Sequence, residues 1–253
     1  MKKLLFIINP MAGRQQAQTD LYKMVKIFAD HDYEVTVYPT RARLDCTRKV
    51  LEDAGRFDLV VCCGGDGTLN EMVSGMMQRQ DRRPMGYIPL GSTNDLAVSL
   101  RLPTRVEEAA LRAVTGNEFH MDVGTLNDRY FNYIAAFGAF TETSYATPQE
   151  IKNALGHLAY ILEGVKSLGK ILPIHVKITA DDEQFEEDYL FGAVTNTISL
   201  GGVLKLDPEK VLLDDGMYEL LLVKNPTNAL EAQAMLTAIM TQNFDGPLVK
   251  MFH

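Results

Sequence analysis

The sequence predicts an α/β fold: an N-terminal three-layer α/β domain followed by a mostly antiparallel β-sandwich domain. Short apolar runs alternate with helical patterns of about 10–15 residues in the first half, as in parallel β-α units. The run at 59–63 is continuously apolar, which is typical of a strand covered on both faces. Beyond residue 122, strand-like segments follow one another with few helices between them, which indicates an antiparallel arrangement.

The elements of the first half follow from this periodicity. We predict strands at residues 4–8, 33–38, 59–63 and 85–89. Helical patterns between them predict helices at 18–31, 42–54 and 69–78. Because strands and helices alternate, the sheet should be parallel, with right-handed connections.

The second half has a different pattern. It predicts strands at 130–139, 174–180, 189–195 and 218–223, and helices at 148–169 and 228–242. Six acidic residues between positions 181 and 188 predict a solvated hairpin turn. The change of pattern places a domain boundary near residue 124, giving one domain at 1–124 and a second at 125–253.

Composition narrows the class of protein. The chain has 253 residues, 46% hydrophobic and 23% charged, as in globular proteins. No apolar run approaches the ~20 residues of a membrane-spanning helix, and the first apolar stretch ends at Asn9, too early for a signal peptide. Three cysteines without metal-binding spacing indicate a reducing compartment, by default the cytoplasm. A net charge of −8 argues against nucleic acid as the main partner.

Three polar loops follow predicted strands, at residues 9–14, 64–71 and 90–95. Ligands of open parallel sheets bind outside the carboxyl ends of the strands, where such loops gather. We therefore expect the three loops to form one site. A plain turn at Asn9-Pro10 and simple helix capping by Ser92 or Thr93 are the structural alternatives.

The loop at 64–71 is the most informative. Its three glycines allow close approach of a ligand, and the following helix offers free backbone N–H groups to an anion. Asp66 lies within this loop, so a polyphosphate held with Mg²⁺ fits better than a phosphate alone. The loop lacks the lysine of the Walker pattern and the third glycine of the dinucleotide pattern. A tight structural turn is the alternative interpretation.

Three motifs connect the chain to a known family. They are Asn-Pro-x-Ala-Gly at 9–13, Gly-Gly-Asp-Gly-Thr-Leu-Asn-Glu at 64–71, and Pro-Leu-Gly-Ser-Thr-Asn-Asp-Leu-Ala at 89–97. The sequence resembles the soluble bacterial diacylglycerol kinase family, which is grouped with the sphingosine kinases. NAD kinases share the middle motif. The third motif and Asp214-Asp215-Gly216 narrow the resemblance to lipid kinases.

The resemblance implies that the three-layer α/β domain at 1–124 is the nucleotide-binding catalytic domain and that the β-sandwich at 125–253 is the lipid-substrate domain. It implies a reaction between ATP and a membrane lipid. It implies nucleotide-binding positions at Asn9, Pro10, Met11, Ala12, Gly13, Thr40, Gly65, Asp66, Gly67, Thr68, Leu69, Asn70, Glu71 and Ser92. It implies a catalytic acidic network of Asp66, Asp95 and Asp122 that acts on Mg²⁺ through water. A second, structural Mg²⁺ would be held by Asp215 and the carbonyls of Leu212 and Met217; a plain turn is the alternative for that segment.

The chemistry of phosphoryl transfer agrees with these parts. It depends mostly on in-line positioning and charge neutralisation. The glycine loop would cradle the phosphates, Mg²⁺ would screen their charge, and a carboxylate would accept the proton of the lipid hydroxyl.

The family pattern also includes a C-terminal motif. The family continues with an Asp-Gly-Glu motif whose glutamate resembles a catalytic base, and this motif does not occur in the sequence. We expect that the sequence lacks that tail; loss of the catalytic base is the alternative.

A lipid substrate implies transient contact with the inner membrane surface. The apolar stripe at 151–171 predicts a helix that faces the core or a membrane. Homodimers are common in the family, so the resemblance also allows a homodimer.

Two other functions remain open. The first is a kinase of a soluble substrate such as NAD, although the Asn-Thr-Asp element of NAD kinases is not found. The second is a catalytically inactive nucleotide-binding protein with a regulatory role.

Overall fold

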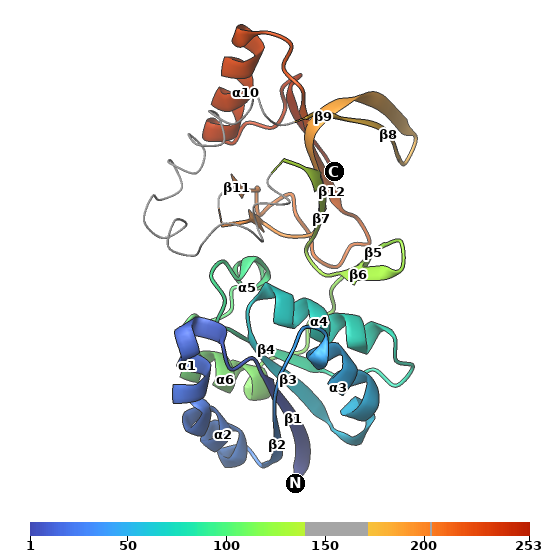
Figure 1. Cartoon of the computed structure of the whole chain (residues 1–253). Helices are drawn as coiled ribbons and strands as arrows, with labels where there is room; N and C mark the ends of the chain where they lie inside the picture. Colours follow the sequence, from blue (N-terminus) through green and yellow to red (C-terminus); the bar gives the residue numbers. More distant parts are fainter. Residues whose placement is uncertain (140–171, 203) are drawn as a thin grey trace. The chain divides into compact units, whose positions relative to one another are not determined.

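A computed structural model of the chain describes residues 1–139, 172–202 and 204–253 (Figure 1). These residues form two compact units. The first unit comprises Met1–Tyr133 and Thr197–Gly202, and the second comprises the remaining described residues. The helices predicted at 148–169 and along 151–171 lie outside the described residues. The functional division at residue 124 stays a prediction.

The first unit is built around a four-stranded parallel sheet with the order β2-β1-β3-β4. Its strands are β1 (Lys2–Ile8), β2 (Tyr33–Pro39), β3 (Leu59–Gly64) and β4 (Met85–Pro89). Its helices are η1 (Ala12–Gln15), α1 (Gln16–Thr19), α2 (Leu21–Asp30), α3 (Asp45–Asp53), η2 (Ala54–Arg56), α4 (Asp66–Met77), α5 (Asp95–Ser99) and α6 (Val106–Thr115). The hairpin of β5 (Gly124–Leu126) and β6 (Arg129–Phe131) and the short β10 (Ser199–Leu200) complete it. All four predicted strands are confirmed.

Helices cover both faces of this sheet, which gives three layers (Figure 1). Alternate residues of β1 point to opposite faces, as the pleat requires. Phe6 belongs to the buried cluster with α2 and α6, where its ring meets Phe28 edge-on at 5.2 Å. Ile7 belongs to the cluster with α3, α4 and α5. With both faces buried, the ends of the strands are the part of the sheet left open for a ligand.

The second unit contains a five-stranded antiparallel sheet. Its strands are β7 (Ile134–Gly138), β8 (Ile174–Ala180), β9 (Glu183–Thr195), β12 (Glu219–Lys224) and β13 (Val249–Phe252). The order is β13-β12-β9-β7, and β8 pairs with β9. Tyr189, Leu220 and Leu222 form the centre of its core. An α/β part followed by antiparallel sheets confirms the predicted fold class.

One strand and one turn of this half differ from their predictions. The strand predicted at 130–139 is divided into β6 and β7, because the chain bends at Asn132 and Tyr133. Only Asp181 and Asp182 form the hairpin turn, and the other acidic residues of that run belong to β9.

The remaining elements of the second unit are short β11 (Leu204–Lys205) and α10 (Ala229–Thr241). Asn228 caps α10: its side chain accepts a hydrogen bond from the Glu231 amide at 2.9 Å. Within the described ranges, no helix has both the length and the apolar character needed to cross a bilayer.

Candidate functional site

The three polar loops of the first unit lie together at the carboxyl ends of β1, β3 and β4. The Asn9 amide donates to the Cys63 carbonyl at 2.9 Å, and the Leu90 amide donates to the Gly64 carbonyl at 2.7 Å. A Cβ added to Gly91 would lie 2.6 Å from the Cα of Gly65, so the second and third loops touch through their backbones. Glycine is required there because of this close approach.

Helix α4 begins at Asp66, three residues earlier than predicted, directly after Gly65. No side chain caps this helix, because its N-cap residue is glycine. The Gly67 position has open space around it, with no atom within 4 Å of an added Cβ. Uncapped amides and the positive end of the helix dipole form a site suited to an anion.

Asp66 occupies the first position of this helix and connects it to the third loop. Its Oδ2 accepts a hydrogen bond from the Thr93 hydroxyl at 3.1 Å. Its Oδ1 is buried and has no hydrogen-bond partner in the part of the chain that the structure describes. A buried carboxylate oxygen without a donor is suited to a cation. This oxygen is thus of the type that Mg²⁺ takes as a ligand, and waters or phosphate oxygens would have to supply the other ligands.

The first loop is fastened to α4 through Asn9. Its Nδ2 donates to the Thr68 hydroxyl at 3.4 Å, while its Oδ1 accepts from the Met11 amide at 3.0 Å. Thr68 is buried, Met11 is exposed, and Gly13 has a positive φ of 60°. The loop is thus held beside the glycine loop by its asparagine. Pro10 and Ala12 lie in the same turn.

Asp95 is almost fully buried, with 2% of its surface exposed. Its Oδ1 accepts from the Ser199 hydroxyl at 2.6 Å and the Gly202 amide at 3.0 Å; its Oδ2 accepts from the Gly201 amide at 2.9 Å. Burial raises the pKa of this carboxyl in spite of these hydrogen bonds, and the charge of Asp66 adds to the effect. Asp95 therefore lies near enough to Asp66 for their charges to interact. Both carboxylate oxygens of Asp95 accept hydrogen bonds from the segment 199–202.

Asp122 is half-buried in the same unit. Its neighbours Met121 and Val123 pack against the core cluster that contains Leu69 and Leu96. These two leucines belong to α4 and α5, the helices that begin at Asp66 and Asp95. Asp66 and Asp95 thus lie in helices, and Asp122 in a loop, that contribute to one core cluster.

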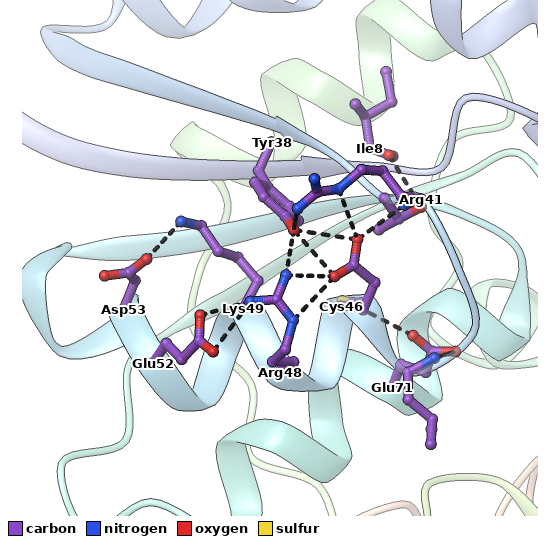
Figure 2. A network of polar contacts seen from close by, with 12 residues as sticks. Ile8, Tyr38, Arg41, Cys46, Arg48, Lys49, Glu52, Asp53 and Glu71 are labelled. Atoms are coloured by element: carbon purple, nitrogen blue, oxygen red, sulfur yellow. Dashed lines mark hydrogen bonds and ion pairs between the residues drawn. The ribbon is translucent and has the colours of Figure 1, made fainter.

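Two polar residues of α4 have partners of their own. Asn70 donates through Nδ2 to the Tyr130 carbonyl at 3.4 Å, and its Oδ1 is buried without a partner among the described residues. Glu71 accepts from the Leu44 amide at 2.8 Å and the Cys46 amide at 3.3 Å. The Glu71 carboxylate therefore caps the first turn of α3, as Figure 2 shows.

Thr40 follows β2 at the same end of the sheet. Its amide donates to the Ile8 carbonyl at 2.9 Å, and its hydroxyl reaches the same oxygen at 3.4 Å. The next residues are braced by Asp45, which accepts from the Arg41 amide at 2.9 Å and from Arg48 at 2.6 Å (Figure 2). The Arg48 guanidinium holds the pKa of Asp45 below its usual range. Thr40 is thus on a well-anchored loop.

The remaining predicted positions are more exposed. Ser92 is exposed in the third loop. In the second unit, Leu212 and Met217 are 54% and 46% exposed, and the Asp215 carboxylate accepts from the Met217 amide at 2.9 Å. Among the described residues, no group of three or more His, Cys, Asp or Glu side chains could hold a metal ion. The structural Mg²⁺ at Asp215 stays a prediction.

Sequence reasoning missed several residues near these loops. Ser199, Gly201 and Gly202 contact Asp95 from more than 100 positions away. Asn132 is buried, and its side chain has no hydrogen-bond partner among the residues that the structure describes. The Gly201-Gly202 pair is the one sequence feature that could have drawn attention to the segment that contacts Asp95. Neither motif nor periodicity singled out Asn132.

Comparisons with known proteins show the family of this chain. The family model of the diacylglycerol kinase catalytic domain matches residues 3–126. The diacylglycerol kinase of Bacillus subtilis (strain 168) is 37% identical over 226 residues, covering 88% of this chain and 74% of that protein. That of Staphylococcus saprophyticus subsp. saprophyticus is 31% identical over 249 residues, covering 98% and 81%.

Solved structures give the same result. The crystal structure of a diacylglycerol kinase from Bacillus anthracis str. Sterne aligns with a TM-score of 0.77 at 28% identity, covering 96% of this chain and 79% of that chain. Another structure from that organism aligns with a TM-score of 0.81 at 28% identity, covering 99% and 82%. With the glycine loop, its uncapped helix and the matched relatives together, the chain belongs to the diacylglycerol kinase family, a family of kinases.

Proposed function

We propose that this protein is an ATP-dependent lipid kinase that phosphorylates the hydroxyl of diacylglycerol or a related lipid, giving a product such as phosphatidic acid. One observation supports this most directly. The uncapped start of α4 lies between two other polar loops and carries the buried Oδ1 of Asp66, which has no partner in the described ranges of the chain. An anion site that adjoins a cation site suits a magnesium-bound polyphosphate.

The nucleotide would lie along the loops that follow β1, β2, β3 and β4. The amides at the start of α4 would hold the phosphates, with Asn9 and Thr68 fixing the first loop beside them. Thr40 and Ser92 are proposed contacts from the flanking loops. Glu71 is proposed to support the nucleotide site through α3, since its carboxylate already accepts from two amides there.

Asp66 is the residue we expect to hold the catalytic Mg²⁺, with Asp95 and Asp122 acting through water. When bound, the ion would neutralise phosphate charge and so lower the barrier to transfer. Because the Asp95 carboxylate accepts from the Ser199 hydroxyl and from the Gly201 and Gly202 amides, its best-supported task is to hold that segment in place. A second Mg²⁺ at Asp215, with the carbonyls of Leu212 and Met217, is proposed on the family resemblance alone.

A membrane lipid as substrate would bring the enzyme to a bilayer surface. We propose a cytoplasmic protein that binds transiently at the inner membrane surface and forms a homodimer. The 31–37% identity to proteins named diacylglycerol kinase supports the lipid class and leaves the choice of lipid to experiment. Phosphorylation of NAD and an inactive, regulatory nucleotide-binding protein are the alternatives.

One assay separates these functions. The protein is incubated with labelled ATP and Mg²⁺ and with diacylglycerol micelles, a long-chain sphingoid base or NAD. Label in diacylglycerol supports the proposal. Label only in the sphingoid base would show a lipid kinase with a different lipid substrate. Label only in NAD would exclude the lipid kinase. ATP binding without any transfer would favour the regulatory protein.

A further inference from the structure

Asn132, directly after β6, is the most unusual polar residue of the first unit. Its side chain is completely buried, and neither its amide oxygen nor its amide nitrogen has a hydrogen-bond partner among the described residues. Leaving a buried polar group unpaired costs about 1–3 kcal/mol. Such a residue is expected where a ligand or bound water supplies the missing hydrogen bonds.

Two further unpaired oxygens lie on one face of α4. They are Oδ1 of Asp66 and Oδ1 of Asn70, and both are buried without a partner in the described parts of the chain. The two residues are four positions apart on the helix, so their side chains are neighbours. This face of α4 therefore carries two oxygen atoms that lack donors.

The chain around Asn132 packs against this part of α4. Two residues before it, the Tyr130 carbonyl accepts from Nδ2 of Asn70 at 3.4 Å. One residue after it, Tyr133 packs against the core cluster that contains Leu69 of α4. The chain on one side of Asn132 is thus hydrogen-bonded to α4, and on the other side it packs against the core cluster to which α4 contributes.

The chemistry of the three side chains points to a hydrated cation. Carboxylate and amide oxygens are the ligands that Mg²⁺ and its bound waters prefer, and Mg²⁺ usually keeps several waters. The amide of Asn132 can accept from such a water and can donate its N–H to an anionic oxygen. Neither a carboxylate nor an apolar side chain can do both.

We propose that Asn132 and Asn70 are positioning residues for the hydrated divalent cation at Asp66. This inference rests on the proposed function, since the cation is the one that accompanies the nucleotide phosphates. Side chains that orient a metal and its waters typically account for about 10- to 100-fold in metal affinity. An effect of that size is expected for Asn132.

The variant Asn132→Leu tests the inference, which predicts that this change keeps or raises the stability of the metal-free protein but lowers its affinity for the cation. Leucine has a similar size and no polar atoms, so the metal-free protein loses an unpaired buried amide and should be at least as stable. Its affinity for the cation should nevertheless fall about 10- to 100-fold. An asparagine with a purely structural role would give a lower Tm instead.

The measurement is a titration of the full chain with MnCl₂ in the presence of a non-hydrolysable ATP analogue, with free Mn²⁺ followed by electron paramagnetic resonance. Tm is measured separately in EDTA without nucleotide. Asn70→Ala should also weaken Mn²⁺ binding. Ser74→Ala is the matched control, because Ser74 lies one turn further along the same face of α4; it should bind Mn²⁺ as the wild type does.

The outcomes separate this inference from the proposed function. A wild-type protein that binds no Mn²⁺ with the analogue overturns both. Wild-type binding that Asn132→Leu leaves unchanged overturns the positioning role alone, as does a lower Tm of this variant in EDTA. Weaker Mn²⁺ binding with an unchanged or higher Tm supports it.

Discussion

The Asp95 carboxylate accepts a hydrogen bond from the Ser199 hydroxyl at 2.6 Å, although these residues are 104 positions apart. The amides of Gly201 and Gly202 donate to the same carboxylate. A segment from the second half of the sequence is thereby fixed to the start of α5. Asp95 is an anchor of the first unit, in addition to any part it has in catalysis.

Asp95→Asn should destabilise the protein by about 2–3 kcal/mol, because a charged acceptor is lost and an NH₂ group replaces one of the two acceptor oxygens. Ser199→Ala removes one donor only and should cost about 1 kcal/mol. Urea denaturation measures both. If Asp95→Asn unfolds at the wild-type urea concentration, the anchoring role is wrong.

Glu71→Ala should destabilise α3, since its carboxylate accepts from the Leu44 and Cys46 amides. The loss of a helix cap costs about 1–2 kcal/mol. Hydrogen exchange of these two amides should accelerate more than exchange at the end of α3. Glu52→Ala is the control, because Glu52 is an exposed residue of α3 that pairs with Arg48. Equal protection in both variants would contradict the capping role.

Gly91 and Gly67 should respond differently to alanine. Alanine at Gly91 would place a Cβ 2.6 Å from the Cα of Gly65, so the loops must separate at a cost of about 1–3 kcal/mol. Alanine at Gly67 meets no atom within 4 Å and improves helix propensity, so Tm should hold or rise. ATP affinity should fall in Gly67→Ala because the methyl group would stand at the proposed phosphate site. Equal Tm values for the two variants would contradict the close loop contact.

Glu219 should make stability depend on pH. Its side chain is 5% exposed, and burial raises its pKa to about 7, with a further contribution from the charge of Asp215. The folded protein therefore keeps a proton that the unfolded chain releases, so stability should fall as pH rises from about 4.5 to 7. Glu219→Gln should remove this component.

Urea unfolding between pH 4.5 and pH 8, in EDTA to exclude cations, measures the effect of Glu219. The stability gained by Glu219→Gln relative to wild type should increase through that range. Glu209→Gln, at an exposed position, is the control and should run parallel to wild type. A parallel curve for Glu219→Gln as well would show that this carboxyl titrates normally.

The strands of the first unit could be predicted from the sequence because they depend on local signals. Strand β4 has the predicted bounds, since its apolar run is bounded by polar loops. The start of α4 was placed three residues late, because glycines and an aspartate resemble a loop although Asp66 begins the helix. Local pattern could not show that Asp95 binds Ser199 or that Glu71 caps α3, because these contacts depend on tertiary structure.

The central claim is that the start of α4 binds the phosphates of ATP. The most direct test is a crystal structure of the full chain with Mg²⁺ and a non-hydrolysable ATP analogue. We predict phosphate oxygens about 3 Å from the backbone amides of Gly67 and Thr68, with the cation beside Asp66. Phosphates bound elsewhere, with these amides facing only water, would contradict the claim.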